Sequence, residues 1–191
     1  YLERLRDEMN IPIVYVSHAV EEVARLASRV VRLSEGKVVA VGTPAETLAP
    51  TALARGADRF NAVSMITGRV AREDAEFGVT VLAHPAGEIV LPWRIPDASQ
   101  PVRVAIRATN VTLAVQRPSN ISVRSALHGT VVRVAVGDGP FALVTIELVG
   151  GDLLFAYATR LAIAELGLDA GDHVHALVKT VAIDERGVTG L

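Results

Sequence analysis

The hydrophobic pattern changes at about residue 60, and this change limits the folds that the chain can adopt. Upstream of it, short apolar runs alternate with segments whose apolar residues recur at helical spacing. Downstream of it, apolar and polar residues alternate at a period of two, which is typical of half-buried β-strands. We therefore expect two kinds of structure, joined near this point.

The downstream part is predicted to be almost entirely β. Turn signals such as Gly150-Gly151 separate short strands, and one helix is predicted at residues 160–167 with Gly167 as its C-cap. The predicted strands cover residues 64–71, 78–83, 88–91, 102–108, 112–116, 126–136, 142–149, 153–158, 173–179 and 182–184. Many short strands joined by regular turns indicate a β-barrel or a β-sandwich.

The strands contain a weak internal repeat. Thr67-Gly68-Arg69-Val70 resembles His128-Gly129-Thr130-Val131, an offset of 61 residues. Residues 102–107 resemble residues 174–179, an offset of 72 residues. The offset grows by 72 − 61 = 11 residues, about the size of the helix and loop at 161–171, which the first copy lacks. The repeat predicts two related five-stranded units, of which the first is reduced.

The upstream part has the element order of an α/β domain. Thr43, Pro44 and Glu46 form a helix start, in which Thr43 is the N-cap and Glu46 completes a capping box. This helix is predicted to end near Leu53. The other predicted elements are helices at 1–9 and 19–27, a buried parallel strand at 13–16, strands at 29–33 and 37–41, and a linker at 55–58.

Composition excludes several kinds of site. The net charge is 19 − 21 = −2 and aromatic residues make up 4%, which argues against a nucleic-acid-binding surface. The absence of cysteine excludes disulfides and thiolate metal sites. No apolar run reaches the length of a membrane helix and no signal peptide opens the chain. Because the first residue is Tyr1 within a predicted helix, we expect a soluble piece of a longer protein.

His18 directly follows the predicted strand at 13–16 and precedes a predicted helix. Ligands bind at such strand ends in open α/β sheets, although a polar residue there can simply close the strand. The surrounding residues resemble the last part of an ABC-transporter ATPase domain: 11–18 (IPIVYVSH), 27–33 (ASRVVRL), 35–38 (EGKV) and 42–44. This resemblance implies that His18 is the family's switch histidine, which senses the γ-phosphate of ATP.

The family's phosphate-binding loop is missing from this chain. No G-x-x-x-x-G-K-[ST] sequence is present, and nothing before Tyr1 supplies the acidic magnesium ligand or the catalytic glutamate. We therefore expect that this chain alone does not hydrolyse ATP, and that ATP and Mg act only in the full-length parent.

The C-terminal part resembles Mop-type (TOBE) oxyanion-binding domains. The resemblance rests on residues 122–131 (SVRSALHGTV), 158–160 (ATR), 166–172 (LGLDAGD) and 176–180 (ALVKT). Residues 103–111 are similar to the strand that precedes this unit in the ATP-binding subunits of molybdate importers. One departure is Ser125, which stands where the family usually has Asn. The resemblance implies an OB-like fold and a molybdate or tungstate ligand.

A tetrahedral dianion offers only hydrogen-bond acceptors, so its site needs hydroxyl, amide and cationic donors. Ser122, Arg124, Lys179 and Thr180 supply two hydroxyls, a guanidinium and an ammonium. By resemblance, Thr159 adds a third hydroxyl or a backbone amide, and the site is complete only between two subunits. The alternative is that Arg124 and Lys179 are solvated charges that protect an edge strand.

Two further groups of residues have simpler interpretations. Arg107 stands in the first copy where Lys179 stands in the second, and we expect it to have a structural role. His173 and His175 share one strand face, but no third ligand is evident, so we expect no metal site.

Together these patterns predict an α/β tail of an ABC ATPase domain (1–58), a reduced β unit (59–120) and a Mop/TOBE oxyanion-binding unit (121–191). The resemblance implies the regulatory part of a molybdate importer, which forms a homodimer, meets a membrane permease, and lies in the cytoplasm on the inner membrane face. Alternatives are a sugar or sulfate importer whose regulatory part binds a protein, and an OB-like nucleic-acid-binding module, which the charge disfavours.

Overall fold

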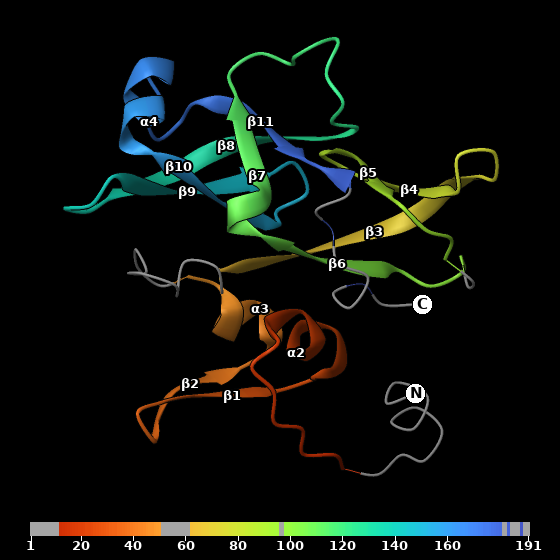
Figure 1. Ribbon diagram of the computed structural model, residues 1–191, viewed down its shortest axis with the longest axis vertical. Helices are drawn as coiled ribbons and strands as arrows, with labels where there is room; N and C mark the ends of the chain where they lie inside the picture. Colours follow the sequence, from red (N-terminus) through yellow and green to blue (C-terminus); the bar gives the residue numbers. More distant parts are fainter. Residues whose placement is uncertain (1–11, 51–61, 96–97, 181–182, 184–187, 189–191) are drawn as a thin grey trace.

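The computed structural model describes residues 12–50, 62–95, 98–180, 183 and 188 (Figure 1). Nine strands, β3 to β11, belong to one antiparallel sheet, called here the β-body, with the main order β10-β9-β8-β5-β4-β3-β6. The strands are β3 (Val63–Asp74), β4 (Val79–His84), β5 (Gly87–Leu91), β6 (Val102–Arg107), β7 (Val111–Ala114), β8 (Ser125–Val136), β9 (Phe141–Leu148), β10 (Leu153–Thr159) and β11 (His173–Val178). The predicted β-rich, OB-like fold class is confirmed, with few helices.

The hydrogen-bond registers of β3 and β8 correspond. Gly68 of β3 pairs with Val102 of β6, and Gly129 of β8 pairs with Val174 of β11. Beyond the glycine, each long strand pairs with the next strand in sequence, β4 or β9. Each ladder also has a register shift at the same place, between Val70 and Arg72 in β3 and between residues 131 and 133 in β8. The two sequence offsets, 61 and 72, therefore correspond to one repeated pairing pattern.

The helix that the first copy lacks lies where the offset changes. This helix, α4 (Arg160–Leu166), follows β10, and Gly167 ends it in the left-handed conformation with φ 61°. The predicted strand at 182–184 is not confirmed: residues 182 and 184 lie outside the described residues, and Ile183 is in a bend.

The two units exchange their last pairing segments. Leu113 of β7, in the first unit, pairs with Ala176 of β11 in the second unit. Val188, in the second unit, forms a bridge with Val104 of β6 in the first unit. Since Ala176 and Val104 correspond by the 72-residue offset, the exchange is reciprocal.

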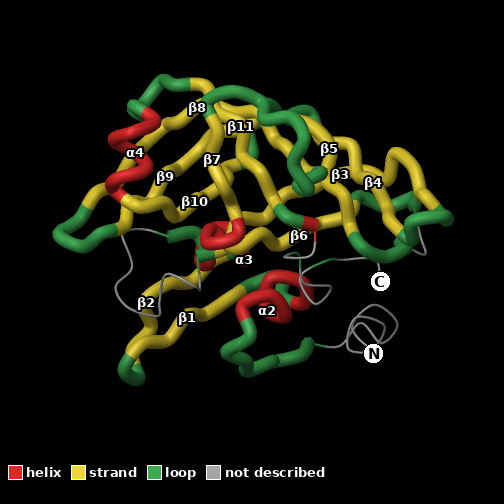
Figure 2. Tube along the Cα trace, turned by 45° about the horizontal axis from the view of Figure 1, so that its top comes forward, coloured by secondary structure: helices red, strands yellow, loops and turns green. Residues whose placement is uncertain are grey.

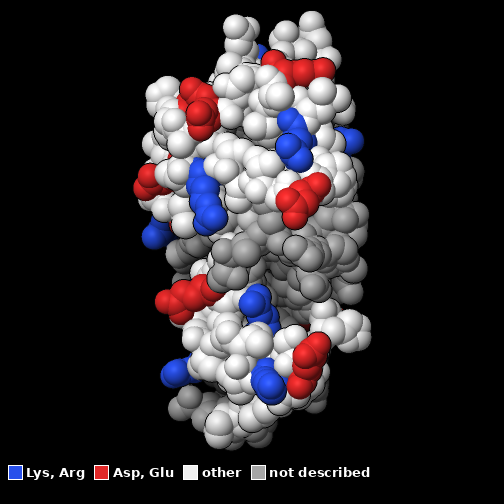
Figure 3. Space-filling model, turned by 90° about the vertical axis from the view of Figure 1, so that its left-hand side faces the viewer, with Lys and Arg blue, Asp and Glu red and all other residues white. Residues whose placement is uncertain are grey.

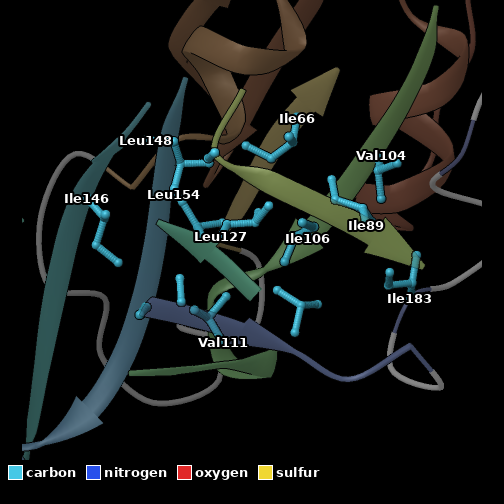
Figure 4. Close-up of a cluster of buried hydrophobic side chains, with 14 of the residues drawn as sticks. Ile66, Ile89, Val104, Ile106, Val111, Leu127, Ile146, Leu148, Leu154 and Ile183 are labelled. Carbon is cyan, nitrogen blue, oxygen red and sulfur yellow. The ribbon is translucent and has the colours of Figure 1, made fainter. Parts of the chain in front are cut away.

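A shared core joins the units. Ile66 and Ile106 from the first unit and Leu127 and Leu154 from the second are at most 2% exposed and belong to one cluster. Figure 4 shows side chains of this cluster that project from strands of both units toward one another. Burial of these aliphatic side chains is the main contribution to stability. Among the described residues, no helix is long and apolar enough to cross a membrane.

Residues 12–50, called here the N-terminal unit, lie on the side of the β-body formed by β3 and β6 (Figures 1 and 2). The unit contains α2 (Val20–Leu26), β1 (Val30–Ser34), β2 (Lys37–Gly42) and α3 (Pro44–Leu48). The predicted hairpin is confirmed, and its turn places Glu35 and Gly36 at φ 49° and 74°. The predicted helix at 1–9 and linker at 55–58 lie outside the described residues.

The prediction of a buried strand at residues 13–16 is wrong. This segment belongs to no helix or strand, and Val14 and Val16 are 94% and 91% exposed. No strand lies beside it among the described residues, so its backbone has no ladder in which to pair. The apolar run predicted burial, which depends on neighbouring strands that the described chain does not supply.

The helix that begins at Thr43 is shorter than predicted. Thr43 accepts a hydrogen bond from the Glu46 amide, and the Glu46 carboxylate accepts one from the Thr43 amide, so the capping box is confirmed. The helix ends at Leu48 and not near residue 53, because Ala49 is extended at ψ 135°. Pro50 follows, and a residue before proline is disfavoured in the helical conformation.

Both apolar and ionic contacts hold the N-terminal unit to the β-body. Ala24 of α2 is fully buried against Val63 of β3 and Ala105 of β6. Beside this contact, the Arg107 guanidinium donates a hydrogen bond to the carboxylate of Glu21. The Glu21 side chain is 4% exposed and that of Arg107 is 38% exposed.

Candidate functional site

Arg124 and Lys179 lie at adjoining strand ends. The ladder between β8 and β11 ends with Ser125 opposite Val178, so the next pair of positions is Arg124 and Lys179. Residues directly opposite each other in an antiparallel pair project from the same face. The structure therefore brings together the beginning and the end of the second unit, and Ser122 and Thr180 adjoin this pair in sequence.

These two cations have no acidic partner among the described residues. Both side chains are exposed; Arg124 donates only to the backbone oxygen of Ile121. Three other arginines of the β-body, Arg72, Arg94 and Arg107, are paired with carboxylates. Ser122 is also exposed, whereas the Thr180 hydroxyl is buried without a hydrogen-bond partner. Uncompensated cations beside an unused hydroxyl are suited to an anion.

Thr159 is far from this group within one chain. It ends β10 opposite Phe141 of β9, and the neighbouring Ala142 pairs with Val136, the last residue of β8. Arg124 precedes the first residue of the same 12-residue strand. From Arg124 to Val136 the separation along the strand is up to about 40 Å, at about 3.3 Å per residue. Thr159 also caps α4, because its hydroxyl accepts a hydrogen bond from the Ala162 amide.

Arg107, which corresponds to Lys179, has a carboxylate partner. Its ion pair with Glu21 connects the β-body to α2. Val63 stands at the position that corresponds to Arg124, so the first unit lacks the second cation. The structural role predicted for Arg107 is consistent with this contact.

His18 is separate from the other candidate residues. It is exposed and lies just before α2 in the N-terminal unit, whereas the others belong to the second unit of the β-body (Figure 1). The strand that was expected to precede it is absent, as described above. The structure therefore does not bring His18 to the site at Arg124.

The second unit of the β-body matches a known domain family. The TOBE domain family matches residues 121–184. Residues 121–184 are a TOBE domain.

The whole chain is similar to molybdenum import ATP-binding proteins named ModC. It is 44% identical over 190 residues to the protein of Mesorhizobium japonicum, which covers 100% of this chain and 51% of that protein. It is 41% identical over 184 residues to the protein of Rhizobium meliloti, again over 51% of the relative. The chain thus spans about half the length of these relatives and matches their C-terminal half, which confirms the resemblance predicted from the sequence.

A solved structure has a similar fold. It is the cytoplasmic molybdate-binding protein ModG with molybdate bound, at a TM-score of 0.54 and 24% identity. The match covers 63% of this chain and 92% of that chain. At this identity the similarity supports the fold only.

The departure at Ser125 of the TOBE domain has a structural explanation. Ser125 is fully buried, and its hydroxyl accepts a hydrogen bond from the Val90 amide of β5. Ser64, at the corresponding position of the first unit, is also buried and accepts from the Phe155 amide of β10. Each serine thus connects its own unit to the other. Ser125 is therefore a structural residue and is not exposed to a ligand.

The sequence did not single out the loop between β7 and β8. This loop crosses the face of β11 and leaves a depression of about 180 Å³ beside Arg124. Its walls include Arg117, Ser119, Asn120 and the buried Leu177. The sequence of this polar loop does not indicate a binding role for Arg117, because arginines are common in surface loops. Its place beside Arg124 depends on how the loop folds back over the sheet.

Three histidines extend the same sheet face away from Arg124. His128 of β8 lies opposite His175 of β11, with ring centroids 5.2 Å apart, and His173 stacks on His128 at 5.6 Å. Nδ1 of His173 is 3.1 Å from the Thr130 hydroxyl oxygen. Among the described residues, no group of three or more histidines and carboxylates is arranged to hold a metal ion.

The histidine row is expected to make stability depend on pH. Burial, and then the charges of His128 and Arg117, lower the pKa of His175 below its usual 6.5. The unfolded chain therefore binds more protons just below pH 6.5, so stability falls slightly as the pH falls through that window. Thermal midpoints at about pH 7.5 and about pH 5.5 measure this. His175→Gln should show a smaller decrease; an unchanged decrease would contradict the assignment to His175.

The surface charge does not favour nucleic acid on the face that Figure 3 shows. Lysines and arginines there alternate with aspartates and glutamates, and neither charge gathers into a patch. Binding to a phosphate backbone needs a continuous basic surface. The nucleic-acid-binding alternative therefore gains no support from this view.

Proposed function

We propose that this chain is the C-terminal half of the ATP-binding subunit of a molybdate importer, and that its TOBE domain binds molybdate or tungstate. The observation that carries the proposal is that two cations, Arg124 and Lys179, lie at adjoining strand ends without an acidic partner in the part of the chain that the structure describes. The similarity of the whole chain to ModC proteins supports the transporter class.

The donor set fits a tetrahedral dianion. A guanidinium donates two parallel hydrogen bonds and an ammonium acts as a point charge, so Arg124 and Lys179 complement each other. The hydroxyls of Ser122 and Thr180 add donors beside them, and the buried Thr180 oxygen has no hydrogen-bond partner among the residues that the structure describes. Burying that hydroxyl without a partner is unfavourable, so a bound anion would satisfy it.

Thr159 enters this site from a second copy. Within one chain it lies at the opposite end of β8, so it reaches an anion at Arg124 only across an interface between two subunits. The proposal therefore includes a homodimer formed through the TOBE domain, which contributes Thr159 or its backbone amide.

The N-terminal unit is the end of the ATPase domain in this proposal. Its exposed apolar residues, such as Val16, Leu33 and Val38, are those that the remainder of an α/β domain would cover. His18 acts as the switch histidine only in the complete ATPase, which binds ATP and Mg. The transporter's permease subunit holds the full-length protein on the cytoplasmic membrane face.

Molybdate would act as a feedback signal. An anion held between paired TOBE domains favours the arrangement of two subunits in which the site is complete. A second arrangement of the subunits binds ATP productively. Molybdate changes transport activity only to the extent that its affinity differs between these two arrangements. Accumulated molybdate would thereby slow further import.

Calorimetric titration of this chain with molybdate tests the proposal, with sulfate and phosphate as competing anions and with the oligomeric state measured in parallel. Arg124→Gln and Lys179→Gln should each weaken molybdate binding by about tenfold, because each removes a charge-assisted contact. Arg133→Gln is the matched control, since Arg133 is an exposed cation nearer the other end of β8.

Three outcomes would each contradict part of the proposal. Unchanged affinity in both variants, with normal thermal melts, would remove these residues from the site. Sulfate binding as tight as molybdate binding would show that the site does not select molybdate. The proposed dimer fails if binding saturates while the chain stays monomeric at every concentration.

A further inference from the structure

The loop between β7 and β8 forms one wall of a depression at the candidate site. In Figure 1 this loop rises above the sheet between the end of β7 and the start of β8. Beneath it, Arg117, Asn120 and Arg124 line a volume of about 180 Å³, with Ala126 and Leu177 of the sheet below. All of these residues come from a single chain.

Arg117 has no ion-pair partner among the described residues. The charge of Arg117 contributes to lowering the pKa of Glu88 of β5, which lies opposite Ala126. Arg72 already holds Glu88 through two hydrogen bonds of 2.5 and 2.9 Å. That contact is the main cause of the lowered pKa of Glu88, to which the charge of Arg117 adds less. The charge of Arg117 is therefore not neutralised by this carboxylate.

The polar side chains that line the depression can all donate hydrogen bonds, and no carboxylate is among the lining residues. These donors are the guanidiniums of Arg117 and Arg124, the hydroxyl of Ser119 and the carboxamide of Asn120. Asn120 has φ 57°, a left-handed conformation that asparagine tolerates better than most residues, and it turns the loop back over the sheet. Two like charges in one small depression repel each other, and an anion between them removes that repulsion.

We propose that Arg117 is a further binding residue for the oxyanion, and that it holds the ligand from the loop side while Arg124 holds it from the strand end. This inference rests on the proposed function and assigns to the same site a second guanidinium. Each guanidinium can donate two parallel hydrogen bonds to one edge of a tetrahedral anion. Two guanidiniums therefore suit a tetrahedral anion, which has several such edges, better than a planar carboxylate, which has one.

The loop also supplies a carboxamide to a site where Ser125 stands in place of the family's usual Asn. The Ser125 hydroxyl is buried and accepts a hydrogen bond from the Val90 amide. The carboxamide of Asn120, in contrast, lines the depression. The donors for one anion are thus drawn from two segments, the loop and the start of β8.

Calorimetric titration of the 191-residue chain with molybdate is the test, with Arg117→Gln, Arg117→Lys and the control Arg133→Gln. Arg117→Gln should weaken molybdate binding by about tenfold, since a charge-assisted bidentate contact is lost. Arg117→Lys keeps the charge but not the fork, and its affinity should lie between those of the unchanged chain and Arg117→Gln. Arg133→Gln should change affinity by less than about twofold.

The outcomes separate this inference from the proposed function. If Arg117→Gln binds molybdate like Arg133→Gln while Arg124→Gln is weakened, the inference is wrong and the proposed function stands. If the unchanged chain does not bind molybdate, both are wrong. Because Arg117 is exposed, the variants should have the thermal midpoint of the unchanged chain. If Arg117→Gln is destabilised, the affinity of Arg117→Lys decides. Full molybdate affinity in Arg117→Lys would show that the guanidinium of Arg117 is not needed.

Discussion

Replacing Gly129 by alanine is expected to lower the free energy of unfolding by about 3 kcal/mol. A Cβ at this position would lie 2.6 Å from the backbone oxygen of Glu147 and 2.7 Å from Cγ2 of Ile146. Both atoms belong to β9, whose antiparallel ladder with β8 begins at Gly129, where β8 also pairs with β11. Backbone cannot move aside as a flexible side chain can, so the two strands would have to separate.

The repeat supplies a graded comparison. At Gly68, the corresponding position of β3, a Cβ would meet Leu82 Cβ at 3.0 Å and the Ala83 oxygen at 3.1 Å. Gly68→Ala should therefore cost less, about 1 kcal/mol. Gly137→Ala is the control, because its Cβ meets no atom within 4 Å. Urea unfolding midpoints measure all three variants. A Gly129→Ala midpoint equal to that of Gly137→Ala would show that β8 and β9 do not approach this closely.

The sequence predicts the fold best where the local hydrophobic pattern and the long-range strand pairing favour the same structure. The alternation of residues and the repeated glycines predicted most strands of the β-body within a few residues of their ends. The exchange of β7 and the Val188 segment between units could not be predicted, since short apolar strands pair equally well with several neighbours. In the upstream part, burial at residues 13–16 was inferred from apolar content alone, and Pro50 was overlooked as a signal for the end of the helix.

The candidate site could be predicted only in part. Ser122, Arg124, Lys179 and Thr180 came from motifs, and the pairing of β8 with β11 explains why the two motifs meet. The charge balance at these residues could not be predicted, because whether a cation has a partner depends on the fold. Arg117 shows the same limit, since its place in the depression depends on how the preceding loop folds back.

Removing the guanidinium of Arg107 is expected to destabilise the chain by about 3 kcal/mol. The cause is the carboxylate of Glu21, which is 4% exposed and would be left as a buried charge without a partner. Glu21→Gln should cost less, about 1 kcal/mol, because Arg107 is 38% exposed and water can solvate it. Urea unfolding of Arg107→Ala and Glu21→Gln measures the difference, with Arg133→Ala as the control for loss of an exposed cation.

The double variant Glu21→Gln/Arg107→Ala should be more stable than Arg107→Ala alone, because no buried charge then remains. If Arg107→Ala is no less stable than Glu21→Gln, the carboxylate is not confined as described and the contact between α2 and β6 is mainly apolar. The comparison also bears on Lys179, which occupies the corresponding position in the second unit without an acidic partner among the described residues. One position of the repeat thus fastens the N-terminal unit through the chain's own carboxylate, while its counterpart, Lys179, is the cation that we propose binds an anion from solution.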